Sequence, residues 1–294
     1  EMLHHFAVSG VDTWLWLPPL VAFGISLFTS MAGISGAFLL LPFQHSVLGY
    51  TAPGVSATNL VYNLVATPGG AYRYLREGRM LWPLVGMVTA GTLPGVALGY
   101  WIRIVYLRDV EAFRLFVGFV LLYMGYRLVS ELWAGSGRIV DAVSLPGAGR
   151  VEVLVAQVAR VELVFRGTHY RFDPRAMFLL ALAVGVVGGI YGIGGGAIIA
   201  PLCVTLFRLP VYVVAGAAVA STLLTSIAGV ALYMLAPAPA GVATQPDWLL
   251  GLLFGIGGLV GMYVGARLQK HVPQRALHAG LAAVMLATAV FHIF

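Results

Sequence analysis

The chain has 294 residues, of which 60% are hydrophobic and only 10% are charged. This composition, with a mean hydropathy of +0.92, excludes an ordinary soluble domain and predicts an all-α polytopic membrane protein, because several nearly uncharged runs reach the roughly 18 residues that a membrane-spanning helix needs. The net charge of +6 does not indicate a nucleic-acid partner, since the arginines fall between the apolar runs, as is usual for loops beside a lipid bilayer.

Eight apolar segments separated by polar breaks are predicted along the chain. They cover residues 14–48, 53–73, 81–103, 110–133, 175–207, 211–236, 247–268 and 274–294. The first apolar run is not preceded by a basic region, so we expect no cleavable signal peptide. We predict two membrane repeats, residues 14–133 and 175–294, joined by a polar insert at 134–174.

The insert differs in composition from the segments on either side. Its second part, VEVLVAQVARVELVFRGTHYRFDP, is rich in Val and Phe, partly alternates between apolar and polar residues, and has Gly167 at a turn position. This pattern predicts a small β-hairpin or β-meander outside the membrane. A simple connector and a regulatory or partner-binding module both fit such an element.

The two membrane repeats resemble each other in sequence. GISGAFLLLP, which begins at Gly33, aligns without gaps with GIGGGAIIAP, which begins at Gly192, at an offset of 159 residues. GTLPGVALGYWI, from Gly91, aligns with GGLVGMYVGARL, from Gly257, at an offset of 166. The seven additional residues fit in the loop APAPAGVATQPD of the second repeat. Matches in this order predict a duplicated unit, a common plan among transporters.

The lengths of segments 14–48 and 175–207 bear on the topology, because each is too long for one spanning helix of about 20 residues and too short for two. If each is one broken span, the repeats are parallel and the 17 basic residues divide 10 to 7 between the two sides. If each is a re-entrant hairpin, the repeats are inverted and the division is 14 to 3, with only Arg103, Arg108 and Arg114 outside. The second division obeys the positive-inside rule better. We therefore predict two inverted repeats, each a broken or re-entrant hairpin followed by three transmembrane helices, with a cytoplasmic β-rich insert.

Each predicted hairpin has a glycine-rich tip at which its second half-helix begins. Helix N-termini present unpaired N–H groups and the positive end of the helix dipole, so they bind anions without a cationic side chain. Tight helix packing is the alternative role for glycine, and we favour that role for the pairs Gly95/Gly99 and Gly261/Gly265. The candidate anion-binding residues at the tips are Gly33, Ser35, Gly36, Gly192, Gly194, Gly195 and Gly196.

The segment that follows each hairpin carries neutral polar side chains, in SATNLVYN and ASTLLTS. Neutral donors suit an anion that must bind and then leave, so the pairs Thr58–Asn59 and Ser221–Thr222 are further candidate substrate contacts. Hydrogen bonds between helices, or to the carbonyl four residues earlier, explain the same residues equally well.

Signals for catalysis are weak. No glycine-rich loop ends in Gly-Lys-Ser or Gly-Lys-Thr, and no His or carboxylate cluster inside a segment has the spacing of metal ligands. The single cysteine, Cys203, excludes an internal disulfide. His45 is an ionisable residue inside a hairpin, where a capping or interface role is favoured over substrate binding. We expect a protein that is not an enzyme and has no metal or cofactor.

The stretch GIGGGAIIAPL, followed by ASTLLTSIAG, resembles the TauE/SafE family of sulfite exporters, as do the fainter copy GISGAFLLLP with SATNL and the basic stretch YLREGRMLW. The resemblance covers essentially the whole chain outside the insert. It implies a carrier in the bacterial plasma (inner) membrane that moves small sulfur oxyanions or organosulfonates, typically outward. The family's glycine motif falls on Gly33, Gly36, Gly192, Gly194, Gly195 and Gly196, while Ser35 and Ala37 stand where the second tip has glycine.

These observations together predict a secondary transporter that exports a small sulfur-containing oxyanion held between the two glycine-rich tips. A membrane-embedded enzyme or assembly factor that uses the insert is an alternative, and an anion channel is another. The sequence leaves open which anion moves, whether transport is coupled to another ion, and whether the protein forms a homodimer.

Overall fold

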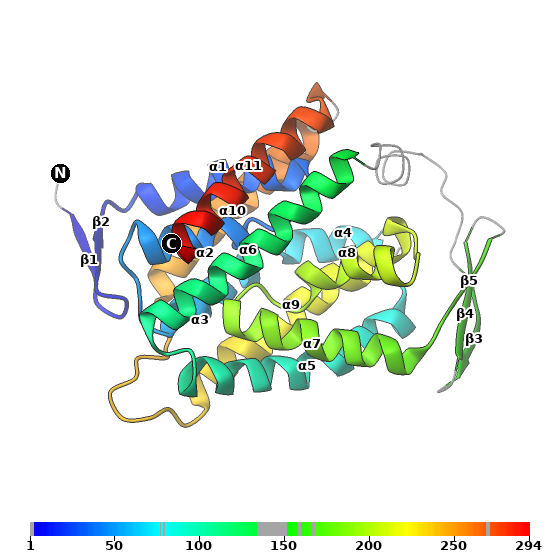
Figure 1. Ribbon diagram of the computed structural model, residues 1–294, viewed down its shortest axis with the longest axis horizontal. Helices are drawn as coiled ribbons and strands as arrows, with labels where there is room; N and C mark the ends of the chain where they lie inside the picture. The colour runs from blue at the N-terminus through cyan, green and yellow to red at the C-terminus, as the bar shows by residue number, and fades with distance from the viewer. Residues whose placement is uncertain are drawn as a thin grey trace.

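The computed structural model describes residues 3–76, 78, 80–133, 152–157, 160–165, 168–268 and 271–294, and its helices lie side by side in one bundle (Figure 1). The helices are α1 (Leu17–Met31), α2 (Ala37–Ser46), α3 (Gly54–Ala66), α4 (Pro68–Arg76), α5 (Trp82–Val105), α6 (Val110–Trp133), α7 (Pro174–Tyr191), α8 (Gly196–Leu206), α9 (Val211–Leu235), α10 (Trp248–Leu268) and α11 (Gln274–Ile293). Among the described residues, α5, α6, α7, α9, α10 and α11 are long and apolar enough to cross a membrane. The predicted helical, polytopic membrane protein is confirmed.

Both segments predicted as hairpins are broken into two helices. Segment 14–48 forms α1 and α2, and segment 175–207 forms α7 and α8, with a short non-helical turn inside each pair. Gly192 ends α7 with a φ of +82°, the left-handed conformation that glycine adopts readily after a helix. The N-cap residues of α2 and α8 are Gly36 and Gly195, which have no side chain to cap the helix. In the first turn of α2 the N–H groups of residues 37 to 39 bond to Ser35 and Gly36.

Segment 53–73 is also broken, which the sequence analysis did not anticipate. Helix α3 ends at Ala66 and α4 begins at Pro68. Proline lacks the N–H that would continue the hydrogen-bond ladder and is favoured in the first turn of a new helix, so the break falls at this position. The other five predicted segments outside the hairpins each form one helix, with ends within two residues of those expected.

Two pairs of helices pack parallel to each other through glycines. Three glycines of α5 lie against successive turns of α7, and three glycines of α10 lie against successive turns of α1. Residue numbers rise together in both pairs, so the paired helices run in the same direction. The predicted packing role of Gly95, Gly99, Gly261 and Gly265 is confirmed. The six glycines are Gly91, Gly95 and Gly99 on α5 and Gly257, Gly261 and Gly265 on α10.

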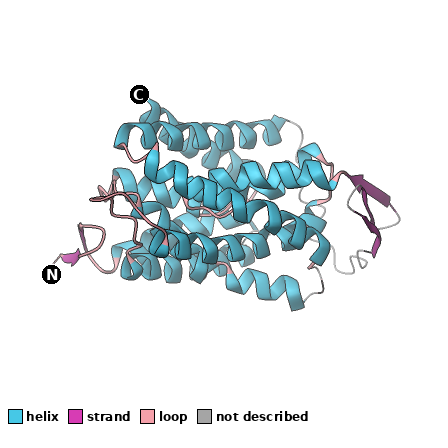
Figure 2. Ribbon diagram, turned by 90° about the horizontal axis from the view of Figure 1, so that it is seen from below, coloured by secondary structure: helices cyan, strands magenta, loops and turns pink. Residues whose placement is uncertain are grey.

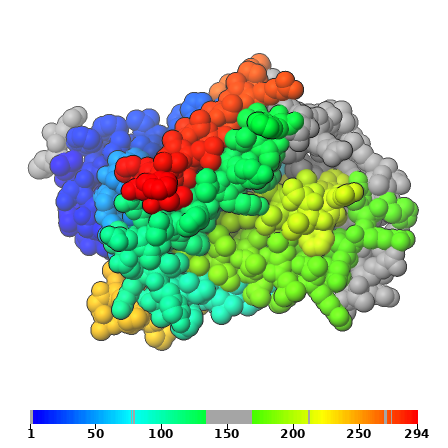
Figure 3. Space-filling model, viewed as in Figure 1, coloured from blue at the N-terminus to red at the C-terminus, as the bar shows by residue number. Residues whose placement is uncertain are grey.

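Helices α6 and α11, the last of each repeat, pack antiparallel. Gly118 of α6 faces Ala289 and Ile293 at the end of α11, whereas Gly125, further along α6, faces Leu286. Figure 3 shows the two helices as adjacent diagonal bands, green and orange-red, on one face of the molecule. The two helices therefore run in opposite directions.

Helix α9 is the most deeply buried of the six candidate spans. It runs parallel to α5, since the hydroxyl of Thr92 contacts that of Ser221 and the hydroxyl of Tyr100 donates to the carbonyl oxygen of Ala236 at 3.2 Å. The loops that follow α5 and α9 consequently lie at the same end of the bundle.

The insert forms a small sheet at one end of the bundle (Figure 2). Strands β3 (Glu152–Gln157), β4 (Arg160–Phe165) and β5 (Thr168–Phe172) are antiparallel in the order β3-β4-β5. The predicted β-meander is confirmed, while the turn predicted at Gly167 lies outside the described residues.

The opposite end carries a hairpin that the sequence analysis did not predict, formed by β1 (His4–Phe6) and β2 (Val11–Thr13). Ser9, between the strands, donates from its backbone nitrogen (3.1 Å) and its hydroxyl (2.8 Å) to Oδ2 of Asp247. The other oxygen of Asp247 accepts the N–H of Leu250 at 3.1 Å. Asp247 thus caps α10 and fastens the N-terminal hairpin to the bundle.

Candidate oxyanion site

The two hairpins meet at the side chain of Asn59, one of the predicted site residues. Asn59 lies on α3 and is fully buried. Its Nδ2 donates to the carbonyl oxygen of Ala37, in the first turn of α2, and to that of Gly192, at the end of α7, both at 3.1 Å. Its Oδ1 accepts from Nε2 of Gln44 at 3.3 Å. One amide side chain therefore connects the tips of both hairpins.

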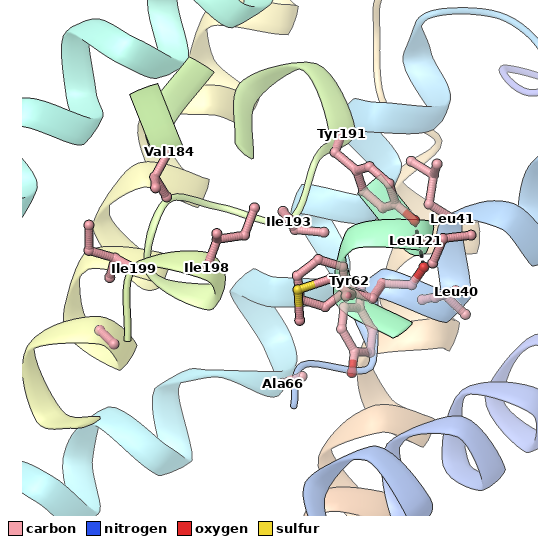
Figure 4. Packing of buried hydrophobic residues seen from close by; sticks show 14 of the residues in the cluster. Leu40, Leu41, Tyr62, Ala66, Leu121, Val184, Tyr191, Ile193, Ile198 and Ile199 are labelled. Carbon is pink, nitrogen blue, oxygen red and sulfur yellow. Dashed lines mark hydrogen bonds between the residues drawn. The ribbon is translucent and has the colours of Figure 1, made fainter. Parts of the chain in front are cut away.

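A second set of contacts brings α7 against the first repeat. The hydroxyl of Tyr191 donates to the carbonyl oxygen of Phe38 at 2.6 Å, and the hydroxyl of Ser56 donates to that of Ile190 at 2.7 Å. Figure 4 shows Tyr191 reaching from the end of α7 toward α2. These two hydrogen bonds hold the end of α7, which leads into the second tip, against α2 and α3 of the first repeat.

The second tip packs directly on α9, and all five of its residues from 192 to 196 are buried. A Cβ at Gly196 would overlap the backbone carbonyl of Ala218, and a Cβ at Gly194 would lie 3.0 Å from Thr222 and 3.1 Å from Ser226. Only glycine allows such a close approach of backbone to backbone. The candidate residues Gly194, Gly196 and Thr222 are thus brought together.

Hydroxyl groups surround Gly195, the residue before α8. Its N–H donates to Oγ1 of Thr225 at 3.0 Å, and a Cβ at this position would lie 2.5 Å from Cγ2 of Thr92. The Thr92 hydroxyl contacts the hydroxyl of the predicted site residue Ser221 at 3.1 Å. The second tip therefore faces a row of neutral hydroxyl groups from both α5 and α9.

The first tip is more open than the second. Gly33 is exposed, has a φ of +73°, and has no atom near the position of a Cβ. The hydroxyl oxygen of Ser35 accepts the N–H of Ala37 at 3.3 Å, so Ser35 already pairs one donor at the start of α2. Gly36 faces the hydroxyls of Tyr62 and Ser26, which bond to each other at 2.8 Å.

Thr58 is the candidate residue that the structure places with a different neighbour. Its hydroxyl donates to the carbonyl oxygen of Gly54 at 2.9 Å and accepts the N–H of Asp247 at 2.9 Å. These hydrogen bonds join α3 to the start of α10, whereas the adjacent Asn59 bonds to the tips. The predicted pair Thr58–Asn59 is therefore split between two neighbourhoods.

Several buried polar atoms on α2, α3, α5 and α9 have no hydrogen-bond partner among the described residues. An unpaired buried polar group costs about 1–3 kcal/mol, so such groups are kept only where something else compensates. Ser226 is beside Gly194, and Asn63 lies one helical turn after Asn59. The unpaired atoms are Asn63 Nδ2, Ser226 Oγ, Gln44 Oε1 and Thr89 Oγ1.

Sequence reasoning missed three residues that shape this region: Thr92, Tyr62 and Tyr191. Thr92 and Tyr191 have mainly apolar and glycine neighbours, and Tyr62 lies among the polar residues of SATNLVYN, so no local pattern distinguishes any of the three from its neighbours. Tyr191 carried one usable signal, because it directly precedes the first glycine of a predicted tip. Thr92 lies within GTLPGVALGYWI, a stretch that drew attention only because its glycines align with those of the second repeat.

Comparisons with known proteins agree with this architecture. The family model described as sulfite exporter TauE/SafE matches residues 19–291. The probable membrane transporter protein YjnA of Bacillus subtilis is 22% identical over 277 residues, which cover 92% of this chain and 96% of YjnA. The probable membrane transporter protein MamO of Magnetospirillum gryphiswaldense is 25% identical over 278 residues, 92% of this chain but 43% of MamO. No solved structure matches the chain. Since the family match spans nearly the whole sequence, the chain belongs to the TauE/SafE sulfite exporter family of membrane transporters.

Proposed function

We propose that this transporter exports small sulfur-containing oxyanions, of the sulfite or organosulfonate type, across the bacterial plasma membrane, and that the anion binds between the two glycine-rich tips. The observation that carries the proposal is the bridge made by Asn59 between Ala37 and Gly192. It brings the N-terminus of α2 close to the turn that joins α7 to α8. The N-cap residues of α2 and α8 are glycines, which have no capping side chain, and the positive ends of the two helix dipoles attract an anion.

The donors at this point suit transport rather than permanent retention. The hydroxyls of Ser221, Thr222 and Ser226 are neutral, so each hydrogen bond to a bound anion is weaker than one from a charged donor. Such a site holds the anion by several weak hydrogen bonds. When one hairpin moves away, these hydrogen bonds break together and the anion is released. Under this proposal, the first tip contacts the opposite side of the anion through Gly33, Ser35 and Gly36.

We infer that residues 14–133 and 175–294 are inverted repeats and that the insert at 134–174 is cytoplasmic. The antiparallel pairing of α6 with α11 supports this relation, because equivalent helices of parallel repeats run in the same direction. Parallel pairing of α5 with α7 and of α10 with α1 is what a two-fold relation between the repeats generates. Repeats of this kind allow alternating access to a central site.

Labelling of single cysteines tests the inverted arrangement. Cys203, the one native cysteine, is replaced by serine, and Arg108→Cys, Pro239→Cys and His169→Cys are made separately, all at exposed positions. A membrane-impermeant thiol reagent applied to intact cells is expected to label the first two, whereas the third is labelled only after permeabilisation. Labelling of Arg108→Cys and Pro239→Cys from opposite sides would contradict inversion, because parallel repeats predict that result.

Export of an anion needs no second ion under this proposal. Moving one elementary charge across 100 mV is worth ~2.3 kcal/mol, so a dianion that leaves a cell with a negative interior gains roughly twice that amount. The membrane potential alone is therefore a sufficient driving force for outward flux of a doubly charged oxyanion.

Flux of radiolabelled sulfite into proteoliposomes tests the site. Gly195→Leu places a side chain against Thr92 at the second tip, and we expect it to abolish saturable flux while the protein still inserts and purifies as a single species. Gly24→Leu is the matched control, because Gly24 lies in α1 with open space where a Cβ would be. Wild-type flux through Gly195→Leu would refute the tip as the binding site, and flux that neither saturates nor shows counterflow would identify a channel.

A further inference from the structure

Asn63, on α3, is a buried amide whose donor is left unused. The residue is 1% exposed, and its Nδ2 has no hydrogen-bond acceptor in the described part of the chain. Burial of such a group without an acceptor is costly, and an apolar residue would fill the same space without that cost. The unused amide therefore indicates a ligand that accepts its hydrogen bonds.

The direction of the Asn63 side chain follows from its neighbours on α3. Successive side chains point about 100° apart around a helix, so Asn63 points between the directions of Ser56 and Asn59. Ser56 bonds to the carbonyl oxygen of Ile190, and Asn59, further along α3, bonds to that of Gly192. The contacts thus advance along both segments together. Asn63, one turn beyond Asn59, faces the region that follows Gly192, where the two tips meet.

The relation between the repeats leads to the same place. Asn63 is equivalent to Thr222, 159 residues later. The Thr222 hydroxyl lies against Gly196 at the second tip, and the residue equivalent to Gly196 is Ala37 at the first tip. Asn59, on the same face of α3, bonds to the carbonyl oxygen of Ala37. Asn63 therefore faces the first tip as Thr222 faces the second.

Gly36, the N-cap residue of α2, provides a second unused donor. It is buried, and its N–H has no acceptor among the residues that the structure describes, which is rare for a buried backbone group. The equivalent N–H, that of Gly195, donates to Oγ1 of Thr225. The residue equivalent to Thr225 is Ala66, which has no hydroxyl. Figure 4 shows Ala66 on α3, one turn beyond Tyr62.

The hydroxyls of Ser26 and Tyr62 provide a third donor. Both residues are buried, and within the described ranges the two hydroxyls bond only to each other, at 2.8 Å. Two hydroxyls carry two protons and one bond uses one of them, so the other proton has no acceptor.

This hydroxyl pair lies close to the N–H of Gly36. Its oxygens are 2.6 Å (Tyr62) and 2.8 Å (Ser26) from the position of a Cβ on Gly36, and that position is about 2.5 Å from the nitrogen of the same residue. The oxygens are therefore at most about 5 Å from the nitrogen. Two hydrogen bonds of about 2.9 Å each span this distance, so one oxygen atom of a ligand can accept from both groups.

We propose that Asn63, the N–H of Gly36 and the Ser26–Tyr62 pair, which we call the donor cluster, bind an oxygen of the transported oxyanion at the first tip. All three groups offer hydrogen-bond donors and none is charged. They suit an oxygen that only accepts, as in ionised sulfite or a sulfonate group, and offer nothing to a cation. The inference rests on the proposed function and adds Asn63, Ser26 and Tyr62 to the residues that determine its specificity.

The donor cluster is divided between two parts of the fold. Ser26 and Gly36 belong to the first hairpin, whereas Tyr62 and Asn63 belong to α3. Movement of the hairpin against α3 therefore separates the donors from one another. An oxyanion held by all of them is then released without the breaking of any ion pair, which fits a carrier that must bind and let go in each cycle.

Thermal-shift titrations of purified protein test the proposal, with sodium sulfite compared against sodium chloride at equal ionic strength. Asn63→Ala is expected to lower sulfite affinity at least tenfold. Its melting temperature without sulfite is expected to change little, because Nδ2 makes no hydrogen bond that the substitution would break. Asn63→Asp has nearly the same shape but places a carboxylate beside the oxyanion, and it is expected to lose the sulfite-induced shift completely.

Ala66→Ser tests the N–H of Gly36 by adding a group. The new hydroxyl can accept that N–H, as Thr225 accepts the N–H of Gly195, so sulfite affinity is expected to fall severalfold although no donor has been removed. Ala283→Ser is the matched control, because it adds the same hydroxyl at an exposed position of α11. Its sulfite affinity is expected to equal that of the wild type.

Wild-type sulfite affinity in Asn63→Ala or in Ala66→Ser overturns the proposal, while the proposed function stands as long as the unmodified protein binds sulfite. If Asn63→Ala cannot be purified, or loses melting temperature together with affinity, Ala66→Ser decides alone. An equal fall in affinity in Ala66→Ser and Ala283→Ser also overturns the proposal. Absence of any response to sulfite, thiosulfate or a sulfonate in the wild type overturns the proposed function itself.

Discussion

The two hairpin tips have the same place in their repeats but are fixed by different means. Ala37 and Gly196 are equivalent, 159 residues apart, and so are their neighbours Asn59 and Ala218. At the first tip the carbonyl of Ala37 accepts a hydrogen bond from the side chain of Asn59. At the second tip the small pair Gly196 and Ala218 lets one backbone rest directly on the other.

This difference shows how a duplicated framework can acquire an asymmetric site. The close backbone contact makes the second tip a fixed wall, because any displacement of α8 must open its contact with α9. The first tip depends on a hydrogen bond and leaves Gly33 exposed, so it has fewer contacts to break. We infer that the first hairpin is the one that moves more easily when the site opens.

The largest effect is expected from removing the close contact at the second tip. In Gly196→Ala the new Cβ would overlap the carbonyl of Ala218, and since backbone atoms cannot rotate away, α8 must separate from α9. Overpacking costs about 1–3 kcal/mol and occasionally more, and we expect the upper end of this range. The measurement is the yield of monodisperse protein together with its melting temperature in detergent.

Ala37→Gly is the matched control at the first tip. It removes a methyl group at the equivalent position and keeps the carbonyl that Asn59 binds, so we expect a loss of at most about 1 kcal/mol, the cost of glycine in a helix. Equal losses in the two variants would show that the tips are fixed in the same way and would remove the basis for distinguishing them.

Much of this fold was predictable from local patterns, for reasons that particular residues illustrate. The run from Gly188 to Gly196 predicts a broken helix because repeated glycines destabilise a helix interior, and the break occurs there. Intervals of four between Gly95 and Gly99 predict close helix packing, as observed. The short hairpin β1–β2 was not predictable, because each strand has only three residues and its anchor, Asp247, lies 238 residues away from Ser9.

The site was predictable only in outline. Asn59 was chosen among several polar residues of α3, but its neighbour Thr58 has the same local signal and bonds to Asp247 instead. Side chains at successive positions point about 100° apart around a helix of 3.6 residues per turn. The positions of the neighbouring helices therefore decide which of the two side chains bonds to the tips and which bonds to the start of α10. Arg103 was predicted as the last residue of segment 81–103 and counted among the arginines outside the membrane, because an arginine at the end of an apolar run usually marks a membrane boundary. Its burial depends on Phe113, which lies on the next helix.

A smaller effect is expected from the bridge at the first tip, in Asn59→Ala. The change leaves the carbonyl oxygens of Ala37 and Gly192 without their donor, and an unpaired buried acceptor costs about 1–3 kcal/mol. Relaxation and entry of water recover part of this cost, so we expect a total loss of about 2 kcal/mol, measured as the shift in melting temperature. Sulfite flux is expected to fall as well, since the tips are no longer held together.

Asn63→Ala provides the comparison, one helical turn away on the same helix. Its Nδ2 has no partner among the described residues, so removing it breaks no hydrogen bond from that atom, and stability is expected to change by less than about 1 kcal/mol. If Asn63→Ala destabilises the protein as much as Asn59→Ala, the two amides are equivalent packing residues of α3. In that case the first tip is not held by a specific hydrogen bond, and its greater freedom relative to the second tip must come from the open space around Gly33 alone.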